Sequence, residues 1–132
     1  MIADTTFPSH FLREGRTGTG GPARAFFAKH RQELIRTSII CVGKVSVSFP
    51  ASADAWEYFK LWKILPLHRG VVDAAADIDR ELVHTGHRLG ENDNWLAGFC
   101  RYYREPVIVS CIKAPVLIAF SETQPTSAPE LL

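Results

Sequence analysis

Short apolar segments rich in β-branched residues alternate along this chain with segments whose apolar residues recur at helical spacing. Strands are expected at residues 2–3, 37–42, 64–67, 106–109 and 116–120. The first is too short to predict from its own pattern and is inferred from the polar turn that follows it. Strands that alternate with helices favour a parallel sheet with helices on both sides. The sequence therefore predicts an α/β fold, a three-layer α/β/α sandwich around a central parallel sheet.

Helices are expected between these strands from their apolar stripes and their end signals. The stripes comprise Phe7, Phe11 and Leu12; Phe26 and Phe27; Ala55, Trp56, Phe59 and Trp62; Val71, Ala75, Ile78 and Leu82; and Trp95, Phe99 and Tyr103. Pro22 suits the first position of a helix, Ser52 suits an N-cap, and Gly86 suits a C-terminal stop.

Three further segments have less regular patterns. Residues 45–49 alternate apolar residues with serine, which predicts a strand by period, with a helix as the alternative. Residues 15–21 are glycine-rich and predict a flexible loop. Residues 121–132 are rich in proline, serine and threonine and predict a flexible C-terminal tail, which leaves residues 1–120 as the domain.

Length and composition limit the class of protein. A chain of 132 residues suits one domain with one core. No apolar run approaches the roughly 18 residues that span a bilayer, and no signal peptide is recognisable, so we expect a cytoplasmic protein without a membrane segment. The cysteines Cys41, Cys100 and Cys111 are odd in number and lie in apolar surroundings, which predicts buried free thiols.

Two acids lie at positions that suit a functional site. Asp4 follows the first expected strand, and α/β folds bind ligands at the carboxyl ends of their strands. Asp93 ends the sequence Gly-Glu-Asn-Asp at residues 90–93, which opens a helix. Each acid also has a purely structural alternative, because Asp4 suits a helix N-cap and Asp93 suits the first turn of a helix.

The segments around both acids form a pattern that a known family shares. Residues 1–7 are Met-Ile-Ala-Asp-Thr-Thr-Phe, residues 90–98 are Gly-Glu-Asn-Asp-Asn-Trp-Leu-Ala-Gly, and residues 103–110 are Tyr-Arg-Glu-Pro-Val-Ile-Val-Ser. Together with the helix over 74–86, they resemble PIN domains of the toxin-ribonuclease (VapC) type. The resemblance covers roughly residues 1–112, is most specific over 88–110, and places a helix at 45–49.

The resemblance implies a metal-dependent endoribonuclease that hydrolyses RNA phosphodiester bonds. Asp4 and Asp93 would bind Mg²⁺ or Mn²⁺ and serve catalysis, Thr6 would assist Asp4, and Glu91 would support Asp93. Members of this family are often dimers, and a small antitoxin binds over their active site. The expected partners are therefore RNA, a cognate antitoxin and a second copy of the chain.

Two positions depart from the family pattern. Lys44 follows Gly43 where the family has a metal-binding carboxylate, and Ile112 stands where it has an acid or an amide. A hard cation needs carboxylate charge, and each unit-charge interaction at about 4 Å is on the order of 4 kcal/mol at an effective dielectric near 20. We expect impaired metal binding, and the alternative function is a catalytically inactive module that binds RNA or an antitoxin-like partner.

RNA binding would depend on a local patch, because a net charge of +1 gives no global nucleic-acid signature. Basic residues lie around the glycine-rich segment and either steer the RNA backbone or form a solvated helix face. They are Arg13, Arg16, Arg24, Lys29 and Arg31.

Overall fold

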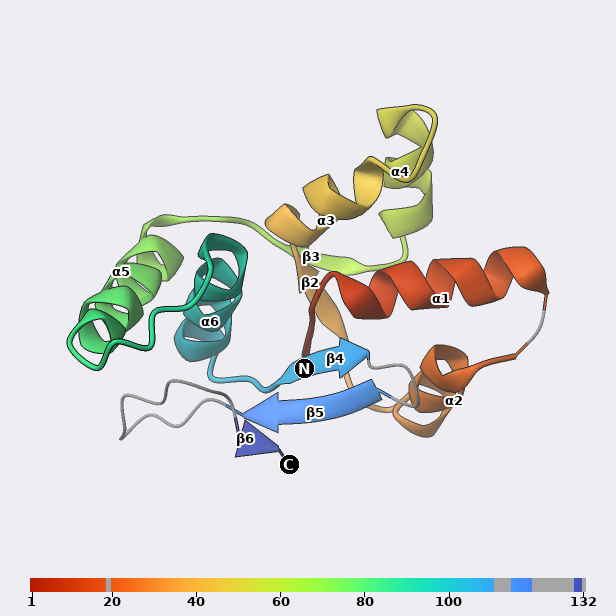
Figure 1. The fold of residues 1–132 in the computed structure, drawn as a ribbon. Helices are drawn as coiled ribbons and strands as arrows, with labels where there is room; N and C mark the ends of the chain where they lie inside the picture. Colours follow the sequence, from red (N-terminus) through yellow and green to blue (C-terminus); the bar gives the residue numbers. More distant parts are fainter. Residues whose placement is uncertain (19, 111–114, 120–129, 132) are drawn as a thin grey trace.

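Among the residues that the structure describes, the strands form one six-stranded sheet. The structure is a computed structural model that describes residues 1–18, 20–110, 115–119 and 130–131 (Figure 1). Its strands are β1 (Ile2–Ala3), β2 (Arg36–Ser38), β3 (Lys63–Leu65), β4 (Val107–Ser110), β5 (Pro115–Ala119) and β6 (Glu130–Leu131). They lie in the order β3-β2-β1-β4-β5-β6.

Four of these strands form the predicted central parallel sheet. β1 pairs in parallel with β2 and with β4, and β2 pairs in parallel with β3. β5 and β6 extend the edge of the sheet in antiparallel pairing. The chain leaves β1 toward β2 and β3 and later returns to the other side of β1 as β4. The order therefore reverses between β1 and β4, and open α/β sheets bind ligands outside the carboxyl ends of strands at such a point.

Helices connect and cover the parallel strands. They are α1 (Thr6–Thr17), α2 (Pro22–Lys29), α3 (Ile39–Ser46), α4 (Ser52–Phe59), α5 (Arg69–Val83) and α6 (Glu91–Tyr103). Figure 1 shows α5 and α6 on one side of the sheet, with α1 and α2 on the other. None of the helices within the described ranges is long and apolar enough to cross a membrane.

The alternation of side chains along the strands places one core on each face of the sheet. Ile2 and Val107 pack with residues of α5 and α6, whereas their neighbours Ala3 and Ile108 pack with residues of α1 and α2. A third cluster joins α3 and α4, and Ile64 of β3 packs against it. Apolar side chains thus cover both faces, and the three-layer α/β/α prediction is confirmed.

The predicted strand over residues 37–42 is wrong beyond Ser38. β2 ends there, and α3 begins at Ile39 because the Ser38 hydroxyl accepts a hydrogen bond from the Cys41 amide at 3.1 Å. The apolar run has β-branched residues that suit a strand, but as a helix it buries Cys41 and Val42 against α4. The helix continues to Ser46, so the strand predicted over 45–49 is also wrong, and the helical alternative applies to its first two residues.

Smaller differences occur at other element ends. α1 includes Gly15 to Thr17, so the glycine-rich loop begins only at Gly18, whose φ of 70° ends the helix. α4 has Ala51 at its N-cap, and Ser52 is its first helical residue instead of its cap. Most of the predicted tail over 121–132 lies outside the described residues, and within it Glu130–Leu131 form β6. Cys41 and Cys100 are buried free thiols, as predicted, and Cys111 lies outside the described residues.

Candidate functional site

Asp4 lies at the point where β1 ends and α1 begins. Its Oδ1 atom accepts hydrogen bonds from the amides of Thr6 (3.0 Å) and Phe7 (3.2 Å) and from the Thr6 hydroxyl (2.6 Å). These bonds satisfy amides at the start of α1 that have no partner within the helix. They also hold the carboxylate in one orientation at the carboxyl end of β1.

Asp93 lies in the first turn of α6, two residues after the helix begins. Gly90 is the N-cap of this helix in an extended conformation and makes no side-chain bond. An acid in the first turn is stabilised by the amide groups there, which accounts for its position on structural grounds. Asp93 is exposed, whereas the residues that follow it in α6 become progressively buried.

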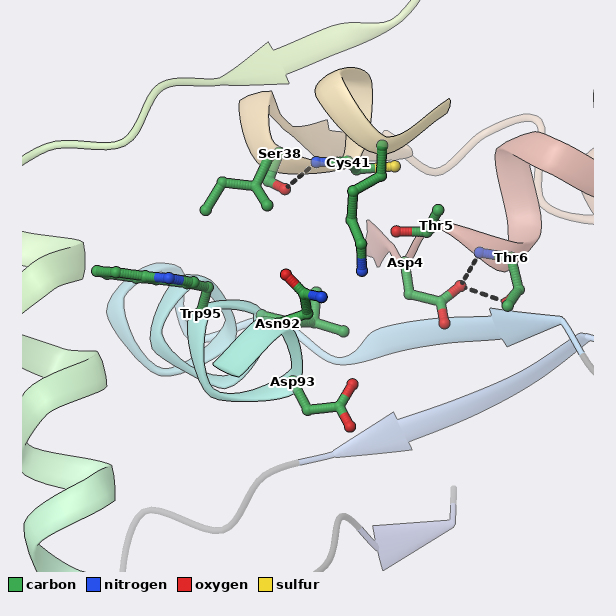
Figure 2. Close-up of a pocket in the computed structure, with 11 residues that line it drawn as sticks. Asp4, Thr5, Thr6, Ser38, Cys41, Asn92, Asp93 and Trp95 are labelled. Carbon is green, nitrogen blue, oxygen red and sulfur yellow. Dashed lines mark hydrogen bonds between the residues drawn. The ribbon is translucent and has the colours of Figure 1, made fainter. Parts of the chain in front are cut away.

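Both acids line one pocket of about 170 Å³ at the carboxyl edge of the parallel sheet. Figure 2 shows their side chains projecting into the same space from β1 and from α6. The lining residues are Asp4, Thr5, Thr6, Ser38, Ile40, Cys41, Lys44, Asn92, Asp93, Trp95 and Leu96. Residues almost 90 positions apart in sequence therefore meet beside the point where the strand order reverses.

The environment of Asp4 disfavours the ionised form of its carboxyl group. Burial raises the pKa of the Asp4 carboxyl, the bonds from Thr6 and Phe7 lower it, and the nearby charge of Asp93 raises it further. Two carboxylates close enough to affect each other, one of them partly desolvated, form an anionic site that a cation would stabilise.

Lys44 lines the same pocket from α3, directly after Gly43. Its charge is close enough to influence the neighbouring Cys41 thiol. Within the described part of the chain it forms no ion pair with Asp4 or Asp93. The ammonium group thus adds positive charge to the pocket without being fixed to either acid.

The other predicted site residue, Glu91, is the first residue of α6 and is exposed, and it is not among the lining residues of this pocket. Across the described ranges, no group of three or more histidine, cysteine or acidic side chains is arranged to hold a metal ion. The two carboxylates therefore form a smaller acidic set than a complete cage of protein ligands would need.

Some lining residues were not predicted from the sequence. The sequence pattern places Ser38 in the strand expected over 37–42, and Trp95 in the apolar stripe of a helix. Trp95 is only partly buried and faces the pocket beside Asn92 (Figure 2). A signal for Ser38 was present, because serine before an apolar segment is a common helix N-cap. No periodic signal separates a pocket tryptophan from a core tryptophan.

Comparisons with known proteins give a structural likeness without sequence support. No protein-family model matches the sequence, and no significant match occurs among curated proteins. Among solved structures, the chain is similar to VapBC2 from Rickettsia felis, which was solved bound to a DNA fragment from its promoter. The TM-score is 0.68 at 12% identity, with 85% of this chain and 87% of that chain covered. At this identity the likeness supports the fold.

Proposed function

We propose that this chain is a PIN-like, metal-dependent endoribonuclease of the VapC toxin type whose metal binding is impaired. The observation that supports this most directly is the meeting of Asp4 and Asp93 in one pocket at the carboxyl edge of the sheet. The fold likeness to VapBC2 agrees with the family pattern around both acids.

The donors in the pocket suit a hard divalent cation such as Mg²⁺ or Mn²⁺ only in part. Mg²⁺ is commonly held by one or two carboxylates together with water and substrate phosphates. Asp4 and Asp93 supply two carboxylates, and the bonds to Asp4 involve Oδ1, which leaves Oδ2 for a ligand. When bound, such a cation would polarise the phosphate and lower the pKa of a water molecule.

The protein side chains would then have separate tasks. Asp4 and Asp93 would hold the cation, and Thr6 would keep the Asp4 carboxylate oriented through its 2.6 Å bond. Lys44 adds positive charge to the same pocket, and this charge lowers the affinity of the two carboxylates for a cation.

The proposed partners follow from the family pattern around Asp4 and Asp93. RNA is the proposed substrate, and a small antitoxin that covers the pocket is the proposed protein partner. The fold likeness to VapBC2 bears on the antitoxin partner. A homodimer is also proposed, with the exposed α3–α4 face that includes Val47 and Trp56 available for it.

The decisive test is the substitution Lys44→Glu, which returns a carboxylate to the pocket. The position is exposed on α3, so the fold should be retained. We expect Mg²⁺ affinity, measured by calorimetry, to rise from weaker than about 1 mM by tenfold or more. Cleavage of single-stranded RNA that requires the metal should rise with it. Lys44→Glu combined with Asp93→Asn is the matched control and should lose both gains.

Two results would contradict the proposal. Sub-millimolar Mg²⁺ binding by the unaltered chain would show that Lys44 does not impair the site. A Lys44→Glu chain that folds and binds Mg²⁺ but cuts no member of a varied RNA panel would exclude the nuclease.

A catalytically inactive module that binds RNA or an antitoxin-like partner is the second candidate function. It is favoured by the positive charge of Lys44 in the pocket and by the lack of a cluster of three metal-binding side chains among the described residues. In that case Lys44→Glu should weaken RNA binding in a filter or anisotropy assay, because it removes a contact to phosphate.

A further inference from the structure

Trp95 lies in the lining of the candidate pocket. It lies near the start of α6, two residues after Asp93, and is only partly buried. Its indole lines the pocket that contains both acids. In Figure 2 the indole ring lies on the opposite side of the pocket from Asp4, with Asn92 between them.

The Trp95 indole lacks the aromatic contacts that surround Trp62, which is also partly buried. Trp62 packs against the rings of four other residues, Phe7, Phe11, Tyr58 and Phe59. Within the described part of the chain, Trp95 has neither an aromatic neighbour nor a hydrogen-bond partner for its indole N–H. A large flat side chain without such contacts, facing a pocket, is available to a ligand.

The lining of the pocket is divided chemically. Asp4, Asp93 and Lys44 supply charge, whereas Trp95, Ile40 and Leu96 supply apolar surface. A ligand that fits both parts needs an anionic or metal-binding group joined to a flat apolar ring. A nucleotide has this composition, since its phosphate and its base are covalently linked.

We propose that Trp95, with Ile40 and Leu96 beside it, forms a nucleobase-binding site adjacent to the phosphate position. This inference rests on the proposed function and specifies its substrate as an unpaired nucleotide. Bases of single-stranded RNA stack on aromatic side chains, whereas bases inside a duplex are not accessible to such a ring. Asn92 and the Ser38 hydroxyl line the same pocket and can hydrogen-bond to the edge of the base.

The test compares two probes that differ only in the base. Adenosine 5′-monophosphate and ribose 5-phosphate are titrated into the full chain with Mg²⁺ present. Stacking on one aromatic ring contributes enough to change affinity by about tenfold, so the adenine-containing probe should bind about tenfold more tightly. Trp95→Leu keeps apolar bulk but removes the flat ring, and it should abolish this difference without changing ribose 5-phosphate binding.

Two variants serve as controls. Trp95→Phe retains a ring and should keep most of the preference for the base. Trp56→Leu replaces a tryptophan that is 49% exposed and lines a separate groove on α4, so it should leave the preference unchanged. Trp95 fluorescence supplies an independent readout, because stacking of adenine should quench emission in the parent and in Trp56→Leu but not in Trp95→Leu.

The outcomes separate this inference from the nuclease proposal. Equal binding of the two probes, or binding of neither, would overturn the nucleobase site, even if the Lys44→Glu chain cuts RNA. A preference for the base that survives in Trp95→Leu would overturn it as well. Conversely, a preference that depends on Trp95 would support the site even if no variant cleaves RNA.

Discussion

The ionisation of two buried thiols makes the stability of the fold depend on alkaline pH. Burial raises the pKa of Cys41 to about 11 and that of Cys100 to about 12, from an ordinary value of 9.0. A thiol whose pKa is higher in the folded state favours folding below its ordinary pKa and loses this contribution as pH rises through the folded value. Thiolate is also the reactive form, so both thiols should be inert in the native chain near pH 7.

We therefore predict that the free energy of unfolding falls between about pH 9 and about pH 12, a range set by the ordinary pKa of the thiols and by the raised pKa of Cys100. Urea unfolding at a series of pH values measures this, and Cys100→Ala should reduce the slope. Maleimide labelling at neutral pH checks the burial directly. Native Cys41 and Cys100 that label as fast as the unfolded chain would show that they are accessible.

At the same scale, Asp4 shows how much of the candidate site could be predicted from the sequence. The N-cap and the ligand interpretations are alternatives in the sequence. In the structure Thr5 is the N-cap residue of α1, but one oxygen of Asp4 accepts bonds from the first amides of this helix while the residue also lines the pocket. A carboxylate has two oxygens, so the interpretations are compatible. The sequence indicated Asp4 and Asp93 through a family pattern, whereas the contribution of Trp95 depends on which side of α6 faces the pocket.

At the scale of elements, periodicity identified the long helices better than the short segments. The apolar spacing of α5 placed Val71, Ala75, Ile78 and Leu82 correctly, and all four are buried. It failed over 39–46, where β-branched residues favour a strand but tertiary contacts with α4 favour a helix. Local propensity is weak in such a short segment, and packing that involves distant residues decides the outcome.

The contact between α5 and α6 gives the prediction at this scale. A Cβ atom on Gly98 would lie 2.8 Å from the Cβ atom of Ala75 and 3.1 Å from its backbone Cα and N atoms. The Asn94 amide group also donates to the Ala75 carbonyl at 3.0 Å. Gly98→Ala should therefore force the helices apart and lower the free energy of unfolding by about 1–3 kcal/mol.

Gly43→Ala is the matched control for this effect. It is also a helical glycine, but a Cβ atom there would meet nothing within 4 Å. Helix propensity alone then applies, and stability should rise by up to about 1 kcal/mol. Urea midpoints of the two variants should shift in opposite directions, and a neutral Gly98→Ala would mean that the helices can separate without cost.

At the scale of the whole molecule, the two ends of the parallel strands differ in what they contribute. The candidate pocket lies at the carboxyl ends, and ion pairs join the segments at the amino ends. Glu105, just before β4, pairs with Arg36 at the start of β2 and accepts a 2.9 Å bond from the amino group of Met1 before β1. The guanidinium of Arg36 also lies over the ring of Tyr103. These contacts could not be predicted from sequence, because they depend on the order of the strands.

We predict that Glu105→Gln weakens the fold without altering the pocket. The side chains of Arg36 and Glu105 are only 15% and 26% exposed, so removal of the negative charge leaves a partly desolvated cation without its partner. The expected loss is about 1–2 kcal/mol, between the values for exposed and for buried pairs.

The comparison is Glu57→Gln, which breaks an exposed pair with Lys60 and should change stability by less than about 0.5 kcal/mol. Urea unfolding measures both effects, and Mg²⁺ titration of the Lys44→Glu chain with and without Glu105→Gln measures the pocket. A loss of metal affinity in the folded double variant would show that the amino-end contacts also position Asp4 and Asp93, which contradicts the separation of tasks proposed here.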